Sequence, residues 1–227
     1  LNVNPGLLAE IIKAIMNGKY YRKALELMIA LKMHKYLPSL TQAFKLQYNH
    51  YRKLTIEEFL LLAFVLNKEI DENYLSLVED ITSFKKVYNL VIKNPKSKFD
   101  LLDLYTNGEA ICLMANRINV LLKKARKHYK EISKQYEALP IKTNDDLAFN
   151  KYDIYKLNDE LDEDYINLLV NQIIYKILNQ ELDNDYDAIK VYIINILRDK
   201  KITLTEDHTN YEYPREVVKE EDNDEIV

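Results

Sequence analysis

The residues best suited to bind a ligand form a basic series near the middle of the chain. Its lysines recur at steps of four, three and four residues, with Glu131 as the one opposing charge among them. On a helix these steps place the side chains on one face, opposite an apolar face. Such a stripe suits a phosphate backbone. The candidate phosphate-binding residues are Lys123, Lys124, Arg126, Lys127, Lys130 and Lys134.

Two interpretations of this series stay open. Lysines bind phosphates, but they also keep the solvated face of a long helix soluble. Tyr129 and Tyr136 lie beside the series and are candidates for stacking on bases, whereas most of the 18 tyrosines are expected to pack in the core. The sequence therefore indicates a nucleic-acid contact here without excluding a plain surface.

Other reactive residue types lack a comparable arrangement. The histidines are too scattered to share a metal ion: His34, His50, His128 and His208. The run Asp183–Asp187 resembles the opening of a calcium loop and contains an Asp-x-Asp pair, but Ala188 replaces the loop's glycine. We interpret it as a polar turn that starts a helix. The single Cys112 excludes a disulfide framework and is expected to be a buried thiol.

Helical periodicity predicts the elements that position these residues. Three glycines and five prolines favour long helices over strand-rich folds. Thr55 and Glu58 predict a capping box before a central, wholly apolar helix over Phe59–Leu66. One apolar face continues from about Gly108 to Leu139, which predicts a single helix about 40 Å long that carries the basic series. Further helices are expected over 21–31 (ended by Pro38), 74–91, 145–157, 166–177 and 188–197.

The charges are unevenly distributed along the chain. Residues 1–140 hold 22 Lys and Arg against 14 Asp and Glu, whereas residues 141–227 hold 10 against 22. This separation predicts an anionic partner for the first part and an acidic, solvated end on the second. No apolar run approaches the roughly 20 residues that a membrane span needs. The single Cys112 suits a reducing compartment, so we expect a cytoplasmic protein.

A segment near residue 140 resembles a known family. Its pattern is similar to the tail of bacterial CCA-adding enzymes, members of the tRNA nucleotidyltransferase and poly(A) polymerase family. Weaker similarities reach the helical region after that family's nucleotide-binding neck and the turn between its last two helices. The stretches that resemble the tail are Leu139–Thr143, Asp146–Asn150 and Asp153–Ile154. Those that resemble the helical region after the neck are Glu10–Lys13, Ala24–Met28 and Lys35–Pro38, and Asn179–Asn184 resembles the turn.

The resemblance implies a division of labour. In the family, a head holds the metal-binding carboxylates, a neck selects CTP and ATP, and a helical body and tail hold the acceptor and T arms of tRNA. Pro5-Gly6 stand where the neck's Glu-Arg motif would fall, and the head would precede Leu1. We therefore expect no catalysis and no cofactor in this chain, with Mg and CTP or ATP bound only together with the head. Lys142, inside the tail pattern, joins the candidate RNA-binding residues.

Two departures from the family's pattern concern the tail. Lys151 stands where glycine is usual, and Glu163-Asp164-Tyr165 replace a Gly-Pro-Trp-like helix start. They affect the expected shape of the tail's loop.

The expected fold is all-α, an elongated multi-helix array. We divide it into a neck- and body-like region (1–94), a long connecting helix region (95–136), a tail-like helical domain (137–199) and an acidic, disordered end (200–227). The expected function is tRNA binding by the body and tail of a CCA-adding enzyme, in tRNA 3′-end processing, with tRNA and a head domain or second subunit as partners. The alternative is a helical protein-interaction scaffold descended from that family.

Overall fold

Local sequence specifies the start of α4 (Ile56–Asn67). Thr55 Oγ1 accepts a hydrogen bond from the amide of Glu58 at 3.1 Å, and Glu58 Oε2 accepts one from the amide of Thr55 at 3.0 Å. This reciprocal pair satisfies two amides that have no partner within the helix. Every side chain from Glu58 to Val65 is buried. The predicted capping box and central helix are both confirmed.

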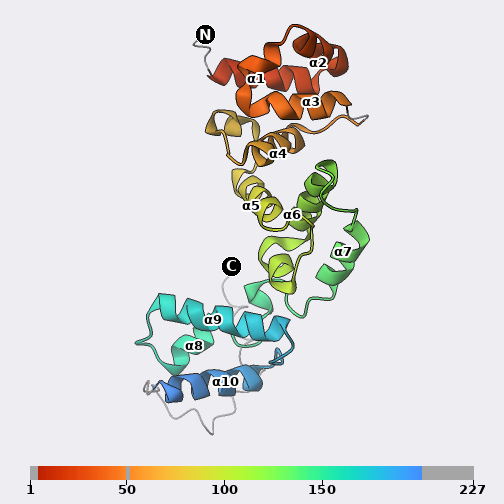
Figure 1. Ribbon diagram of the computed structural model, residues 1–227. Coiled ribbons are helices and arrows are strands. Elements are labelled where there is room, and N and C mark those ends of the chain that lie inside the picture. Colours follow the sequence, from red (N-terminus) through yellow and green to blue (C-terminus); the bar gives the residue numbers. More distant parts are fainter. Residues whose placement is uncertain (1–4, 50–51, 201–227) are drawn as a thin grey trace, which may run out of the picture. The chain divides into compact units, whose positions relative to one another are not determined.

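The computed structural model describes residues 5–49 and 52–200. These residues form two compact units, one up to Glu137 and one from Ala138. The division into four regions expected from the sequence stays a prediction. The first unit holds seven α-helices and three short 3₁₀ helices (Figure 1): α1 (Pro5–Asn17), α2 (Tyr21–Ala30), η1 (Met33–Tyr36), η2 (Pro38–Leu40), α3 (Thr41–Asn49), α4, η3 (Glu72–Leu77), α5 (Ile81–Lys93), α6 (Leu101–Leu121) and α7 (Tyr129–Glu137).

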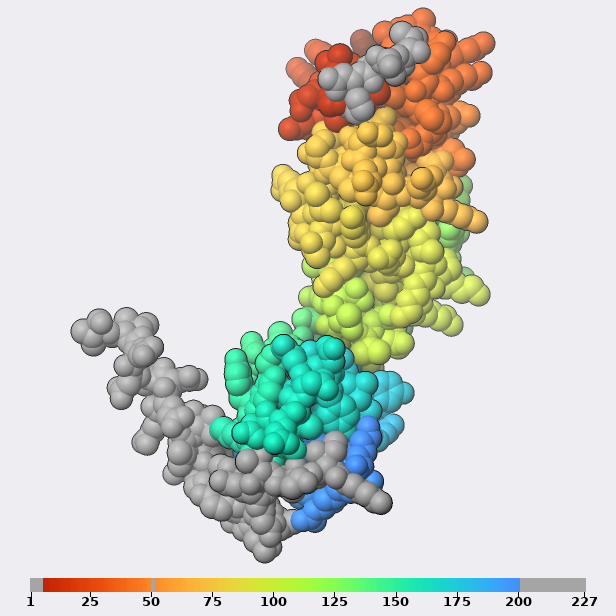
Figure 2. Space-filling view, turned by 90° about the vertical axis from the view of Figure 1, so that its left-hand side faces the viewer, coloured from red at the N-terminus to blue at the C-terminus, as the bar shows by residue number. Residues whose placement is uncertain are grey.

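Helices α1 and α3 pack on α4, and α2 packs on α1 and α3. The rings of Phe44 and Phe59 lie 4.8 Å apart and both are fully buried. In the space-filling view, the red and orange surface of the first helices adjoins the gold surface of the residues that follow them, and α1 contacts both α4 and η3 (Figure 2). The helix expected over 21–31 is α2, but the prediction that Pro38 ends it was wrong. Lys32 takes a left-handed conformation (φ 58°) just after α2, so Pro38 begins η2 instead of stopping α2.

Helices α5 and α6 pack against each other across the segment Asn94–Asp100. Asp103, near the start of α6, accepts hydrogen bonds from Lys93 Nζ at 2.7 Å and Asn94 Nδ2 at 2.8 Å. Farther along α6, Asn119 Nδ2 donates to Asn94 O at 2.9 Å and Ser97 Oγ at 3.0 Å. Two positions on α6 therefore hold the segment that connects α5 to α6.

The single long helix expected from Gly108 to Leu139 is wrong. Helix α6 bends at Gly108, whose φ of 75° suits glycine, and it ends at Leu121. Lys123 is left-handed (φ 58°), and α7 begins only at Tyr129. A 3.6-residue period does not reveal this turn, because two helices that pack on each other bury the same kind of stripe as one continuous helix. Leu122–His128 is therefore a connecting loop.

The second unit contains η4 (Asn144–Asp146), α8 (Lys151–Leu157), α9 (Glu163–Leu178) and α10 (Tyr186–Asp199) (Figure 1). The side chains of Asn150, Asp162 and Asp185 cap the starts of α8, α9 and α10. Each of them accepts a hydrogen bond from a backbone amide in the first turn of its helix. The core is mainly isoleucine and leucine from α9 and α10, and the ring of Phe149 packs at a tilt against that of Tyr186, with centroids 4.9 Å apart.

The all-α prediction is confirmed over the described residues, none of which forms a strand. Among these residues, no helix combines the length and apolar character needed to span a membrane. The predicted disordered end (200–227) lies outside the described residues from position 201 onward, as do His50 and His208.

Candidate functional site

The structure places the basic series on a loop and the helix that follows it. We call residues 123–134 the basic segment. Its six cationic candidates all have exposed side chains. Lys123, Lys124, Arg126 and Lys127 lie on the α6–α7 loop, whereas Lys130 and Lys134 lie on α7. The predicted continuous stripe on one helix face is therefore corrected to a cationic loop followed by two lysines one turn apart.

Buried polar contacts from α6 hold the backbone of the loop. Asn116 is fully buried; its Nδ2 donates to Arg126 O at 3.0 Å, and its Oδ1 accepts from the amide of His128 at 3.0 Å. The amide of Lys124 donates to Asn119 O at 2.9 Å. Because both asparagines lie on α6, the cations extend from a loop tied to the core.

Opposing charge around the basic segment is small. His128 Nδ1 and Glu131 Oε2 form a hydrogen-bonded pair at 2.8 Å, so the segment's one carboxylate already has a partner. Within the described part of the chain, none of the six cations takes part in an ion pair. Exposed cations that form no ion pair within the protein can bind an anionic ligand without breaking an existing ion pair.

A second group of cations is organised by one buried carboxylate in the same unit. Glu58 is fully buried, and Arg52 Nη2 contacts both of its oxygens at 2.8 and 2.9 Å. Arg117 Nη1, from α6, lies 3.1 Å from Glu58 Oε1. Both arginine side chains stay nearly half exposed. Two guanidinium groups on one carboxylate leave a net positive charge at the surface.

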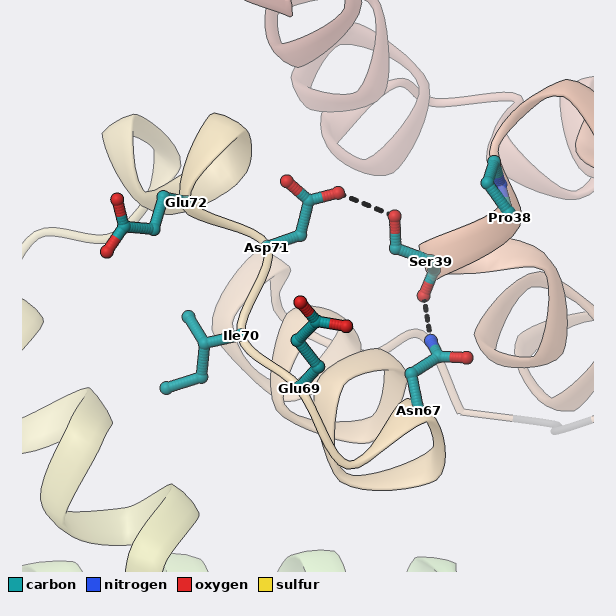
Figure 3. Close-up of a pocket in the computed structure, with 7 residues that line it drawn as sticks. All are labelled: Pro38, Ser39, Asn67, Glu69, Ile70, Asp71 and Glu72. Carbon is teal, nitrogen blue, oxygen red and sulfur yellow. Dashed lines mark hydrogen bonds between the residues drawn. The ribbon is translucent and has the colours of Figure 1, made fainter.

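An acidic hollow of the first unit does not suit an anion. A cavity of about 610 Å³ lies between η2 and the turn after α4, where Glu69, Asp71 and Glu72 gather (Figure 3). Ser39 Oγ donates to Asp71 Oδ2 at 2.6 Å, and Asn67 Nδ2 donates to Ser39 O. These carboxylates would repel a phosphate.

Metal sites and nucleophiles can be judged over the described residues. There, no group of three or more His, Cys, Asp or Glu side chains could hold a metal ion. Asp185 caps α10 by accepting from two amides, which confirms the helix-starting turn. Cys112 is fully buried, and burial, with a smaller contribution from Asp103, raises the pKa of its thiol to about 12. The predicted buried thiol is confirmed.

The segment that resembles a family tail folds around two polar side chains. We call residues 139–154 the tail segment. Asp146 Oδ2 accepts from the amides of Lys142 at 2.7 Å and Thr143 at 2.8 Å, which lowers the pKa of Asp146. Asn184 reaches across from the turn before α10: its Nδ2 donates to Asp146 O at 2.7 Å and its Oδ1 accepts from the amide of Ala148 at 2.9 Å. Lys142, the predicted RNA contact here, is exposed.

Comparison with known families decides the chain's relationship. The family described as tRNA nucleotidyltransferase domain 2 matches residues 76–193, just over half of the chain. The chain belongs to this family. The match contains the basic segment and the tail segment, and it starts after Arg52 and Glu58.

Curated relatives and a solved structure agree with this tRNA nucleotidyltransferase assignment. A CCA-adding enzyme of Listeria monocytogenes serotype 4b (strain CLIP80459) is 27% identical over 197 residues, and one of Listeria innocua serovar 6a is 24% identical over 196. Each alignment covers 79% of this chain and 48% of the relative, so the chain spans about half their length. The Bacillus stearothermophilus CCA-adding enzyme in complex with CTP shares the fold, with a TM-score of 0.70 at 16% identity, over 88% of this chain and 54% of that one.

The tRNA nucleotidyltransferase resemblance read from the sequence is thus confirmed, while the RNA contacts assigned to individual lysines stay predictions. Sequence reasoning missed the Arg52–Glu58–Arg117 group and the bridging role of Asn184. The sequence did contain one signal. Glu58 directly precedes the wholly apolar run Phe59–Leu66, and a carboxylate buried beside such a run requires a cation. Nothing in the sequence pointed to Arg117 as that cation.

Proposed function

We propose that this chain is a tRNA-binding part of a tRNA nucleotidyltransferase and that it holds the acceptor and T arms while the 3′ end is extended. Family membership supports the class of partner. The carrying observation is the basic segment: six exposed cations, without ion pairs among the described residues, four on a loop tied to the core by Asn116 and Asn119 and two on α7. Phosphate contacts position a folded RNA without reading its bases.

The reaction of the whole protein belongs to the same proposal. It is the addition of CTP- and ATP-derived nucleotides with Mg, which we assign to a head domain or second subunit. The described residues contain no carboxylate cluster that fits a metal ion, and we derive no catalytic step from them. We place this work in the cytoplasm, where the lone Cys112 stays reduced.

The test is the affinity of the full chain for a tRNA transcript that lacks its 3′ CCA, over a salt series, with a plain RNA duplex as competitor. The variant carries Lys127→Gln, Lys130→Gln and Lys134→Gln. It should bind more weakly, and the slope of log affinity against log salt should flatten by about one unit per lost contact. The matched control carries Lys13→Gln, Lys45→Gln and Lys85→Gln, three exposed lysines elsewhere in the first unit. Equal slopes in the two triple variants would overturn the role of the basic segment.

One observation favours a second function, a protein-interaction scaffold. Apolar side chains are exposed around α2 and η1, where Leu27 and Leu31 are each 59% exposed and Tyr36 is 74% exposed. Exposed apolar groups that lie together mark contact surfaces more often than isolated ones do. If the chain shows no preference for tRNA over the duplex, this surface becomes the leading candidate site.

A further inference from the structure

A cavity of about 350 Å³ lies between α6 and α7, next to the basic segment. The α6 residues that line it stand at positions 110, 113, 114 and 117, which is the spacing of one helix face. Tyr129 and Ser133 line it from α7, one turn apart. Small-molecule sites span roughly 300–1,000 Å³, so the cavity lies at the lower end of that range. Its residues are Ala110, Leu113, Met114, Arg117, Tyr129 and Ser133.

The lining combines an apolar surface with a few polar groups. Leu113, Met114 and Tyr129 are all partly exposed, so a ligand could still cover part of their apolar surface. The polar groups are the Arg117 guanidinium, the Tyr129 phenol and the Ser133 hydroxyl. A flat ring with a hydrogen-bonding edge and an attached anion matches this combination, because rings stack on tyrosine and thioether groups while the guanidinium takes the anion.

Arg117 is oriented before any ligand arrives. Its Nη1 lies 3.1 Å from the fully buried Glu58 carboxylate, which Arg52 also contacts. One carboxylate balances only one of the two guanidinium charges, so the group retains about one positive charge. A guanidinium has five N–H donors in a rigid fork, and one contact to Glu58 leaves donors for a phosphate.

We propose that this cavity takes one unstacked nucleotide of a bound RNA, with the base against Tyr129 and Met114 and its phosphate on Arg117. The inference rests on the proposed RNA-binding function and adds a base-contacting site to it. Charge complementarity favours this occupant. Lys127 lies two residues before Tyr129 and Lys130 directly follows it, and both lysines are exposed. They can therefore hold the neighbouring phosphates of the strand. Ser133 supplies a hydroxyl for the base edge or the ribose 2′-OH.

The test compares two RNA hairpins with the same stem, one fully paired and one with a single unpaired 2-aminopurine. The full chain should bind the second hairpin about ten-fold more tightly, as expected for one stacked base, and 2-aminopurine fluorescence should change on binding. Ser133→Leu fills the cavity and should abolish this preference while it leaves the affinity for the paired hairpin unchanged. Gln135→Leu adds the same side chain at an exposed α7 position outside the cavity and should keep the preference.

A second variant keeps the test decisive if Ser133→Leu fails to fold. Tyr129→Leu preserves apolar bulk but removes the aromatic face, and it should also lose the preference. Retention of the preference in folded Ser133→Leu or Tyr129→Leu overturns the inference and leaves the proposed function standing. Binding of AMP or CMP that Ser133→Leu abolishes, in a chain that shows no preference for the unpaired hairpin, would overturn the assignment to an RNA strand in favour of a free nucleotide. Failure to bind either hairpin would overturn the inference, and failure to bind the tRNA transcript as well would overturn the proposed function itself.

Discussion

Arg117 Nη1 of α6 lies 3.1 Å from Oε1 of Glu58 in α4, although the whole of α5 separates the two helices in the chain. The same carboxylate caps α4 and holds Arg52 from the segment before it. One buried charge thus serves the helix start, the contact between two helices and the orientation of a guanidinium beside the α6–α7 cavity.

Glu58→Gln should destabilise the first unit by about 1–3 kcal/mol, because it weakens the charge-assisted hydrogen bonds of a fully buried carboxylate to two arginines that keep part of their solvation. Hydrogen exchange of the α4 amides measures this, since it reports the opening of that part of the chain. Glu57→Gln is the matched control one residue earlier, outside any ion pair in the described region, and should stay within about 0.5 kcal/mol of the wild type. Equal α4 protection in both variants would contradict the structural role of Glu58.

The thiol of Cys112 gives the first unit a specific pH dependence. Burial raises the pKa of this thiol from 9.0 to about 12, so the folded chain keeps its proton while the unfolded chain loses it above pH 9. The stability from this group is therefore complete below pH 9 and is lost as the pH rises towards 12. Unfolding of wild type and Cys112→Ala by urea at pH 8 to 11 measures the difference, which should shrink with rising pH. A constant difference would show that the thiol titrates alike in both states.

Asn184→Ala should loosen the tail segment. The side chain of Asn184 donates to Asp146 O and accepts from the amide of Ala148, and each such bond contributes about 0.5–1.5 kcal/mol. Hydrogen exchange of the Ala148 amide should become faster, whereas Asn171→Ala, at an exposed α9 position, should leave it unchanged. Unaltered protection of Ala148 in Asn184→Ala would rule out this bridge in solution.

The carboxyl of Asp146 should titrate below its ordinary pKa, chiefly because it accepts hydrogen bonds from the backbone amides of Lys142 and Thr143. Its stabilising effect is present above the unfolded-state pKa and is lost as the pH falls through the lower folded-state pKa. Carboxyl ¹³C NMR across an acid titration measures the midpoint directly. Asp145→Asn, an exposed neighbour, should not move that midpoint, and an ordinary pKa for Asp146 would contradict the capping geometry.

Local signals in the sequence predicted a large part of this protein. Thr55 and Glu58 marked the start of α4, and the apolar run after them predicted a buried helix, because capping and burial depend on residues within one or two turns. The tail pattern around Asp146 identified the family that residues 76–193 match. Cys112 was predicted to be a buried thiol because it lies beside core positions and has no cationic neighbour within a turn.

The tertiary structure decided whether one periodic stretch of sequence forms a single helix or two helices that pack on each other. The stripe from Gly108 to Leu139 is equally consistent with one long helix or with two helices folded on each other, and the buried Asn116, bonded to Arg126 and His128, holds the folded arrangement. Long-range pairs such as Glu58 with Arg117 leave no local signal, because their energy arises only when distant segments exclude water together. Sequence alone therefore determined the helical class, the start of α4 and the family, and the fold determined where α6 ends and where the cations lie.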